Sequence, residues 1–157
     1  MKLFRIVHPL NGVQRLLLTV WVGAMWAIGY VAAPVLFAAI ESRMQAGAIA
    51  GTLFSIVSWI GLLCGGLILL VQWRARHRGL SRVALSCIIA MLIITGVGQF
   101  GLQPMMADIK AQFPAGVEMS GELRSRFGAL HGISSTLFLI ASMLGALAVW
   151  RSAPTDL

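Results

Sequence analysis

The chain has 157 residues, of which 59% are hydrophobic and only 11% are charged. Soluble domains average about 45–50% apolar and about 25% charged residues, and a single core in a chain of this length cannot bury so much apolar surface. The composition therefore excludes an ordinary soluble domain. The net charge of +7 would also suit a nucleic-acid-binding protein, but the placement of the cations described below has another explanation, and we expect no nucleic-acid partner.

Four stretches of the sequence contain no Asp, Glu, Lys or Arg: Leu16–Ile40, Met44–Trp73, Val83–Ala107 and Phe127–Trp150. A helix needs about 20 apolar residues to cross the hydrocarbon core of a bilayer, and every stretch is longer than that. We therefore predict an all-α fold, an integral membrane bundle of four transmembrane helices, in a single domain over residues 1–157. The expected spans are 16–40, 47–73, 83–107 and 127–150, and residues 108–126 are expected to form an outer polar hairpin.

The first span contains Pro34, which removes a backbone donor and predicts a kink. Before this span, Pro9 and Gly12 predict a turn-rich segment rather than a continuous helix. The apolar stretch is longer than the core of a signal peptide, about 7–15 residues, so we interpret it as a retained span.

The second span carries a stripe of small residues at near-helical spacing: Gly47, Gly51, Ser58, Gly61 and Gly65. Small residues let the backbones of neighbouring membrane helices approach closely. The stripe therefore predicts tight helix packing, and the sequence leaves open whether the partner helix belongs to the same chain or to a second copy.

In the third span, Gln99, Gln103 and Met106 share a face with Gly96, and Pro104 predicts a bend. The helix is expected to continue through Phe113. Ser120 is a suitable N-cap for a long final helix over about Gly121–Trp150.

The orientation follows from the distribution of Lys and Arg. Eight of these residues lie in the amino terminus, the second loop and the carboxyl terminus: Lys2, Arg5, Arg15, Arg74, Arg76, Arg78, Arg82 and Arg151. Four lie on the other side: Arg43, Lys110, Arg124 and Arg126. Cytoplasmic loops carry the excess of Lys and Arg, so both termini are predicted to be cytoplasmic. Anionic lipid headgroups are the expected partners of Arg74, Arg76, Arg78 and Arg82.

Candidate chemistry gathers at the predicted outer end. No nucleotide-binding, metalloprotease or hydrolase motif is present, no span contains Asp or Glu, and Cys64 and Cys87 are interpreted as small hydrophobic residues. No internal repeat is visible.

His131 shares a face with Gly128 and Ser135, at the same level as two glutamines of the third span. The predicted polar pocket consists of His131, Ser134, Ser135, Gln99 and Gln103. A structural hydrogen bond from His131 to a glutamine or serine is the simpler explanation. Met44 and Met106 beside His131 form the alternative, a soft-metal site.

Four segments carry a family resemblance: Ala33-Pro34-Val35-Leu36-Phe37, Gly51-Thr52-Leu53-Phe54, Pro104-Met105-Met106 and His131-Gly132-Ile133-Ser134-Ser135. In this order and spacing, over about Trp21 to Ser135, the chain resembles the transmembrane protein 205-like family, known in bacteria as domain of unknown function 4149. The resemblance implies a four-span membrane protein and supplies no reaction. A eukaryotic relative associated with resistance to a platinum drug implies export or soft-metal handling.

The first functional interpretation is a non-enzymatic component of the bacterial cytoplasmic (inner) membrane with an outward-facing polar pocket and no cofactor. The partner is the lipid bilayer, and a homo-oligomer or a second membrane protein stays open. The first alternative is a small exporter or transporter of a solute or soft metal. The second alternative is a haem- or metal-binding redox protein.

Overall fold

The computed structural model describes residues 9–74, 80–112 and 121–152. The helices are α1 (Pro9–Trp26), η1 (Ala27–Ala32), α2 (Ala33–Ala39), α3 (Arg43–Arg74), α4 (Arg82–Val97), η2 (Gly98–Leu102), α5 (Gln103–Ala111) and α6 (Gly121–Arg151). The described residues contain no strand. The all-α prediction is confirmed.

Four continuous helices in the described ranges are long and apolar enough to cross a membrane: Gly12–Ala39, Arg43–Arg74, Arg82–Ala111 and Gly121–Arg151. Their 28 to 32 residues correspond to about 42–48 Å at a rise of about 1.5 Å per residue. This length matches the full bilayer with its headgroup layers, about 40–45 Å. The protein is a multi-pass membrane protein.

The expected turn before the first span is not observed, because α1 begins at Pro9 and runs through Gly12. Proline is well tolerated in the first turn of a helix, where its missing N–H has no partner in any case. A single glycine inside a helix costs only about 1 kcal/mol. The prediction of a break at these two residues is wrong. The expected N-cap at Ser120 lies outside the described residues.

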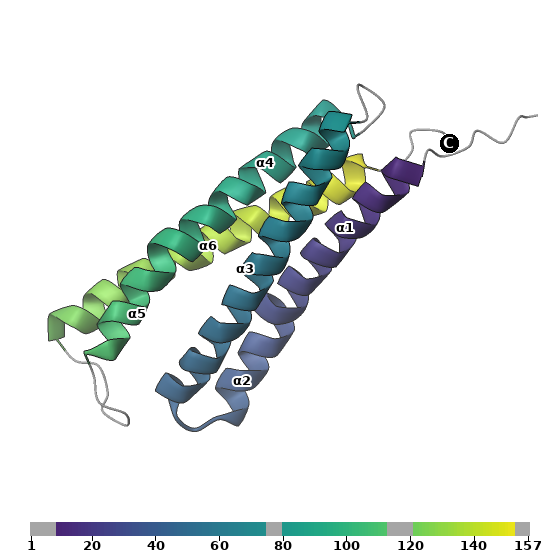
Figure 1. The fold of residues 1–157 in the computed structure, drawn as a ribbon. Helices are drawn as coiled ribbons and strands as arrows, with labels where there is room; N and C mark the ends of the chain where they lie inside the picture. Colours follow the sequence, from purple (N-terminus) through teal and green to yellow (C-terminus); the bar gives the residue numbers. More distant parts are fainter. Residues whose placement is uncertain (1–8, 75–79, 113–120, 153–157) are drawn as a thin grey trace, which may run out of the picture.

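The helices form two hairpins. α1–η1–α2 packs along α3, and α4–η2–α5 packs along α6. Between the hairpins, the α1–α6 and α3–α4 contacts are less extensive and comparable to each other. The start of α1 and the end of α6 lie at the same end of the bundle, as expected for an even number of spans (Figure 1).

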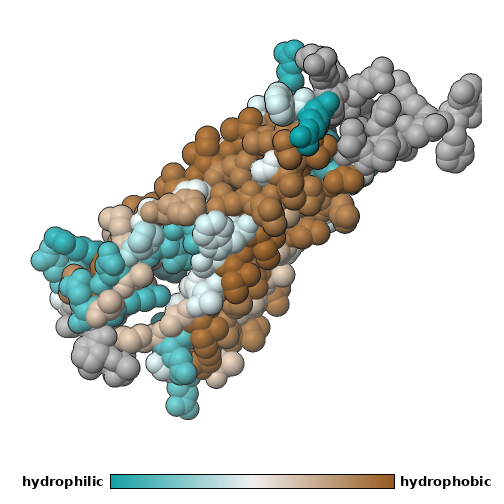
Figure 2. All heavy atoms as spheres, viewed as in Figure 1, coloured by the Kyte–Doolittle hydropathy of each residue, from teal (hydrophilic) through white to brown (hydrophobic). Residues whose placement is uncertain are grey.

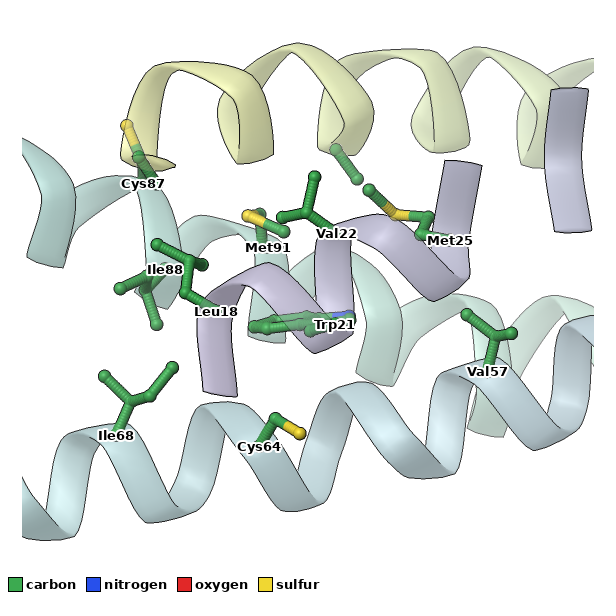
Figure 3. Packing of buried hydrophobic residues seen from close by; sticks show 12 residues of the cluster. Leu18, Trp21, Val22, Met25, Val57, Cys64, Ile68, Cys87, Ile88 and Met91 are labelled. Atoms are coloured by element: carbon green, nitrogen blue, oxygen red, sulfur yellow. The ribbon is translucent and has the colours of Figure 1, made fainter. Parts of the chain in front are cut away.

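The core lies where all four long helices meet. It contains Leu18, Trp21 and Val22 of α1 with Ile68 of α3 and Met91 of α4 (Figure 3). Cys64 and Cys87 are both free and buried, and they belong to this cluster. They contribute as small apolar side chains, as the sequence predicted.

The two hairpins are built alike, although the sequence shows no repeat. Leu18 and Ile88 are both 0% exposed, and Trp21 and Met91 are 1% and 0% exposed. Each pair is 70 positions apart, as are Pro34 and Pro104. The core positions therefore share burial without sharing residue type, whereas the two prolines share both residue type and place in the helix. The expectation that the sequence contains no internal repeat stays a prediction.

Each hairpin contains one π-helical segment just before its proline: η1 before Pro34 and η2 before Pro104. The N–H of Ala33 donates to the carbonyl of Ile28, and the N–H of Gln103 donates to the carbonyl of Gly98. These i→i+5 bonds adjust the helix where proline cannot donate. The predicted kinks therefore take the form of π segments, a feature often found near functional sites.

The glycine stripe of α3 divides into two parts. A Cβ at Gly61 would overlap the Trp21 indole, and one at Gly65 would lie 2.6 Å from Cδ2 of Leu92. These two glycines pack within the chain. A Cβ at Gly47 or Gly51 would meet only atoms at 3.8 Å. Close backbone packing at these two positions, the expectation from the sequence, is therefore not observed.

Candidate polar cleft between the two hairpins

The hairpins separate at the end of the bundle that carries α2 and α5 (Figure 1). There α2 packs on α3 and α5 packs on α6. Figure 2 shows polar side chains gathered over the end of α5 and α6 and a hollow between this end and that of α2 and α3. We call this hollow the polar cleft.

Phe138 of α6 contacts both helices of the other hairpin. The Phe138 ring lies against Gly29 of η1, where a Cβ would overlap it. Its centroid is 5.7 Å from that of Tyr30 and 5.4 Å from that of Phe54, in tilted and edge-to-face arrangements. Such aromatic pairs are favourable beyond their buried area. The aromatic cluster therefore joins the hairpins at the point from which they diverge.

One wall of the cleft is formed by polar side chains of the third span that reach α3. Nε2 of Gln99 donates to Oγ of Ser55 at 3.0 Å. Nε2 of Gln103 donates to the carbonyl of Gly51 at 3.4 Å, and Nζ of Lys110 donates to the carbonyl of Gly47 at 3.2 Å. The acceptors are spaced by four residues and the donors by four and seven, so both sets follow helical periodicity in antiparallel order.

The carbonyls of Gly47 and Gly51 can accept these bonds because each carbonyl has two lone pairs and the helix uses one. Glycine adds no side chain that would cover the oxygen. Polar groups in a membrane are costly unless they find such partners. The first half of the glycine stripe therefore exposes backbone acceptors, whereas the second half allows close packing. Oε1 of Gln99 is buried and has no hydrogen-bond partner among the described residues.

His131 lies on the α6 side of the cleft. It is seven residues from Phe138 and fourteen from Gly145, so the three share one face of α6. The imidazole stacks on Phe127, with centroids 6.1 Å apart and planes 7° apart. The Phe127 ring is in turn 5.5 Å from Nζ of Lys110. His131 is thus linked to Lys110 of the neighbouring helix α5 through an aromatic ring and a cation–π contact.

The predicted site residues are only partly brought together. Gln99 and Gln103 both contact α3, and in the described ranges neither is hydrogen-bonded to His131. Ser134 is half-buried. Oγ of Ser135 donates to the carbonyl of His131 within its own helix at 2.8 Å. Among the described residues no tie joins the His131 side chain to a glutamine or to Ser135, because the glutamine amides bond α3 and the Ser135 hydroxyl bonds the backbone of its own helix.

The soft-metal interpretation receives no support from the described residues. They contain no group of three His, Cys, Asp or Glu side chains that could hold a metal ion. Met106 is buried on α5 and Met44 is half-buried on α3. A site formed by His131 with these two thioethers stays a prediction.

The sequence interpretation missed Lys110, Ser55 and the carbonyl oxygens of Gly47 and Gly51. Lys110 was assigned to the outer polar hairpin by its charge. Its spacing of seven residues from Gln103 places it on the same helical face, and this was the available signal. The backbone acceptors give no signal in the sequence, because glycine looks the same whether it allows packing or exposes an oxygen.

A separate apolar groove, with a volume of about 400 Å³, runs between α1 and α6. Its lining includes Gly23, Trp26, Ala146 and Trp150. Because this lining is apolar and lies within the spans, lipid chains can fill it, and it does not take part in the polar cleft.

A family model described as "Domain of unknown function (DUF4149)" matches residues 16–114, which is more than half of the chain. The match includes three of the four segments that carry the resemblance and ends before His131. It also includes Ser55, Gln99, Gln103 and Lys110, the residues of the α3–α5 contact. No curated protein and no solved structure was found to match the chain.

Proposed function

The chain belongs to the DUF4149 family, and from that premise we propose that it is a non-enzymatic component of the bacterial inner membrane. In this proposal both termini are cytoplasmic and the polar cleft opens to the outer side. The cleft admits the polar part of a ligand between the two hairpins. Arg74 and Arg82, exposed at the opposite end of the bundle, face the anionic headgroups of the cytoplasmic leaflet.

The α3–α5 contact carries this proposal. Gln103 and Lys110 bridge the two helices by long side chains. Glutamine can join membrane helices for structural reasons alone, but a lysine bonded to a backbone carbonyl is an ionisable group. Polar and ionisable residues within membrane spans are functional candidates by default, because they are costly to place there. The polar groups lie where the hairpins separate, so a ligand can reach them.

Cysteine accessibility tests the cleft. In a background with Cys64→Ala and Cys87→Ala, Gln103→Cys should react with a membrane-impermeant maleimide applied to spheroplasts. The reaction needs the thiolate and hence water, which the cleft would supply. The matched control is Met105→Cys, because Met105 is 52% exposed and lies on the lipid-facing side of the same helix.

Met105 is about 3 Å nearer the end of α5 than Gln103 is, at about 1.5 Å per residue. Depth alone would therefore make the Met105→Cys protein react faster. Faster labelling of the Gln103→Cys protein supports a water-filled cleft. The cleft is rejected if the Gln103→Cys protein reacts no faster than the Met105→Cys protein, whichever side of the membrane the maleimide is applied to.

Transport is the second candidate, and the similarity of the two hairpins favours it. Many transporters consist of two structural repeats that rock against each other around a central polar site. Here the repeats are joined near Phe138, and the π segments η1 and η2 lie at equivalent positions beside that junction.

A reversible cross-link separates transport from simple binding. A bis-methanethiosulfonate reagent that joins Gly51→Cys and Gln103→Cys through a short spacer, in the background without native cysteines, would hold the hairpins together by two reducible disulfides. Proteoliposomes loaded with a mixture of small polar solutes should lose one of them, and the cross-link should stop that loss until it is reduced. Unchanged solute content in wild-type proteoliposomes would leave binding as the function.

A further inference from the structure

Lys110 is a cation whose charge is not matched by a carboxylate in the described part of the chain. Its Nζ contacts the carbonyl oxygen of Gly47 at 3.2 Å and the Phe127 ring at 5.5 Å. The described residues contain one side-chain ion pair, at 2.7 Å between Arg126 and Glu122, and it does not include Lys110. An ammonium group has three donors, so the neutral contacts leave donor capacity for an anion.

A second donor points to the same place. Nζ of Lys110 lies 3.8 Å from the position that a Cβ on Gly51 would take. Nε2 of Gln103 lies 3.4 Å from the carbonyl oxygen of Gly51. The cationic group and the amide donor therefore both approach Gly51, and apart from its chain neighbours Nζ of Lys110 is the one described side-chain atom within 4 Å of the Gly51 Cβ position.

The depth of Lys110 matches the headgroup layer. The span Arg82–Ala111 contains 30 residues, or about 45 Å of helix. With Arg82 at one headgroup layer, Lys110 reaches the other, since the bilayer is about 40–45 Å thick with its headgroups. Lipid phosphates lie in that layer, and Gln103 is about 10 Å deeper at about 1.5 Å per residue.

We infer that the polar cleft binds a phosphate-type anion, held by Nζ of Lys110 and by Nε2 of Gln103. This inference rests on the proposed function and names the ligand class of the same cleft. The anion is supplied either by an acidic phospholipid or by free phosphate. The bond from the Lys110 ammonium to the neutral Gly47 carbonyl lacks the attraction between opposite full charges that an anion would add, so the anion can displace it.

The test uses the full chain, purified and delipidated in mild detergent. Its unfolding midpoint is followed while phosphatidylglycerol, phosphatidylcholine, or inorganic phosphate at constant ionic strength is added. Phosphatidylglycerol should raise the midpoint more than phosphatidylcholine does. A response to inorganic phosphate of the same size identifies the free anion as the ligand, whereas a response to phosphatidylglycerol alone identifies the lipid.

Lys110→Gln should weaken the apparent affinity for the active anion about tenfold or more, the change expected from losing a charged hydrogen bond of about 1.5–3 kcal/mol. Arg124→Gln is the matched control, because Arg124 is an exposed cation on α6 for which the structure records no contact with the cleft. Equal responses of wild type and both variants to all three additions would overturn the inference.

Gln103→Glu keeps the inference testable if Lys110→Gln does not fold. The new carboxylate would place a fixed negative charge beside Lys110, where we infer the anion. This variant should be more stable than wild type without added anion and should not respond to phosphatidylglycerol or phosphate. A wild-type response in this variant would overturn the inference.

The two proposals fail in different experiments. Absent labelling of the Gln103→Cys protein rejects the water-filled cleft. Normal labelling combined with an anion response that does not depend on Lys110 rejects only the ligand class.

Discussion

Gly65 of α3 and Gly145 of α6 occupy equivalent positions in the two hairpins. A Cβ at Gly65 would lie 2.6 Å from Cδ2 of Leu92 and 3.0 Å from Cζ3 of Trp21. A Cβ at Gly145 would lie 2.9 Å from Cγ2 of Val22 and 3.3 Å from Cε of Met91. Each glycine thus receives one side chain from α1 and one from α4. These side-chain contacts join the two hairpins and determine how closely they approach each other.

Replacing Gly65 with Leu should therefore destabilise the bundle. The added side chain must displace Leu92 or Trp21 in a packed core, and overpacking typically costs about 1–3 kcal/mol. We expect a lower unfolding midpoint of the purified protein in detergent. The same direction is expected for Gly61→Leu, where the new side chain would meet the Trp21 indole.

Gly66→Leu is the control, because Gly66 is exposed and no atom lies within 4 Å of its Cβ position. Its midpoint should stay close to wild type. Equal losses in the Gly65 and Gly66 variants would mean that helix propensity, rather than packing between the hairpins, determines the effect.

A second prediction concerns the junction at Phe138. Phe138→Ala removes the ring that contacts Gly29, Tyr30 and Phe54, and we expect a loss of about 3 kcal/mol, at the lower end for a buried aromatic residue. Leu139→Ala changes a neighbouring side chain that is 52% exposed and should cost much less. Unfolding midpoints measure both variants. Similar midpoints for the two would show that Phe138 does not join the hairpins.

The four spans could be predicted from the sequence because charge exclusion along a membrane helix is a local property of each segment. The inward direction of Gln99 and Gln103 could also be predicted, since positions four apart share a face. That the glutamines bond α3 and not His131 could not be predicted, because it depends on how the helices lie relative to one another, which no local pattern records.

The likeness of the two hairpins could not be predicted from the sequence for a related reason. Trp21 and Met91 are equivalent in burial, and Leu18 and Ile88 likewise, but a membrane core requires only an apolar side chain of suitable size. Packing therefore preserves volume and position rather than residue identity. Pro34 and Pro104 are the identical pair that marked the repeat, and two prolines alone do not define a period.

The third prediction concerns His131. Its ring is exposed and stacked on Phe127, and no hydrogen bond of the imidazole is observed to the described residues. His131→Gln and His131→Leu should each change stability by less than about 0.6 kcal/mol, the average for a hydrogen bond within a membrane protein. Thermal unfolding of both variants checks this.

A clear loss in His131→Leu that His131→Gln restores would contradict this prediction and would reveal a hydrogen-bond partner outside the described residues. Loss of a bound ligand with unchanged stability would instead make His131 part of the binding site. Wild-type behaviour in both respects would leave His131 as a side chain that lines the cleft without contributing to its function.

The last prediction is the orientation of the whole bundle. Eight of the twelve Lys and Arg residues lie on the side of the amino terminus, the second loop and the carboxyl terminus, and the positive-inside rule places that side in the cytoplasm. Reporter fusions at Arg78 and after Leu157 should be active only as cytoplasmic reporters, and a fusion at Glu118 only as an external reporter.

Arg78 and Glu118 lie outside the described residues, but the helices that flank them fix their sides, since α3 and α4 meet at one end of the bundle and α5 and α6 at the other (Figure 1). The polar cleft lies at the α5–α6 end, so the same fusions decide which compartment it faces. An external Arg78 reporter together with a cytoplasmic Glu118 reporter would reverse the bundle, and Lys110 would then meet the phosphates of the inner leaflet.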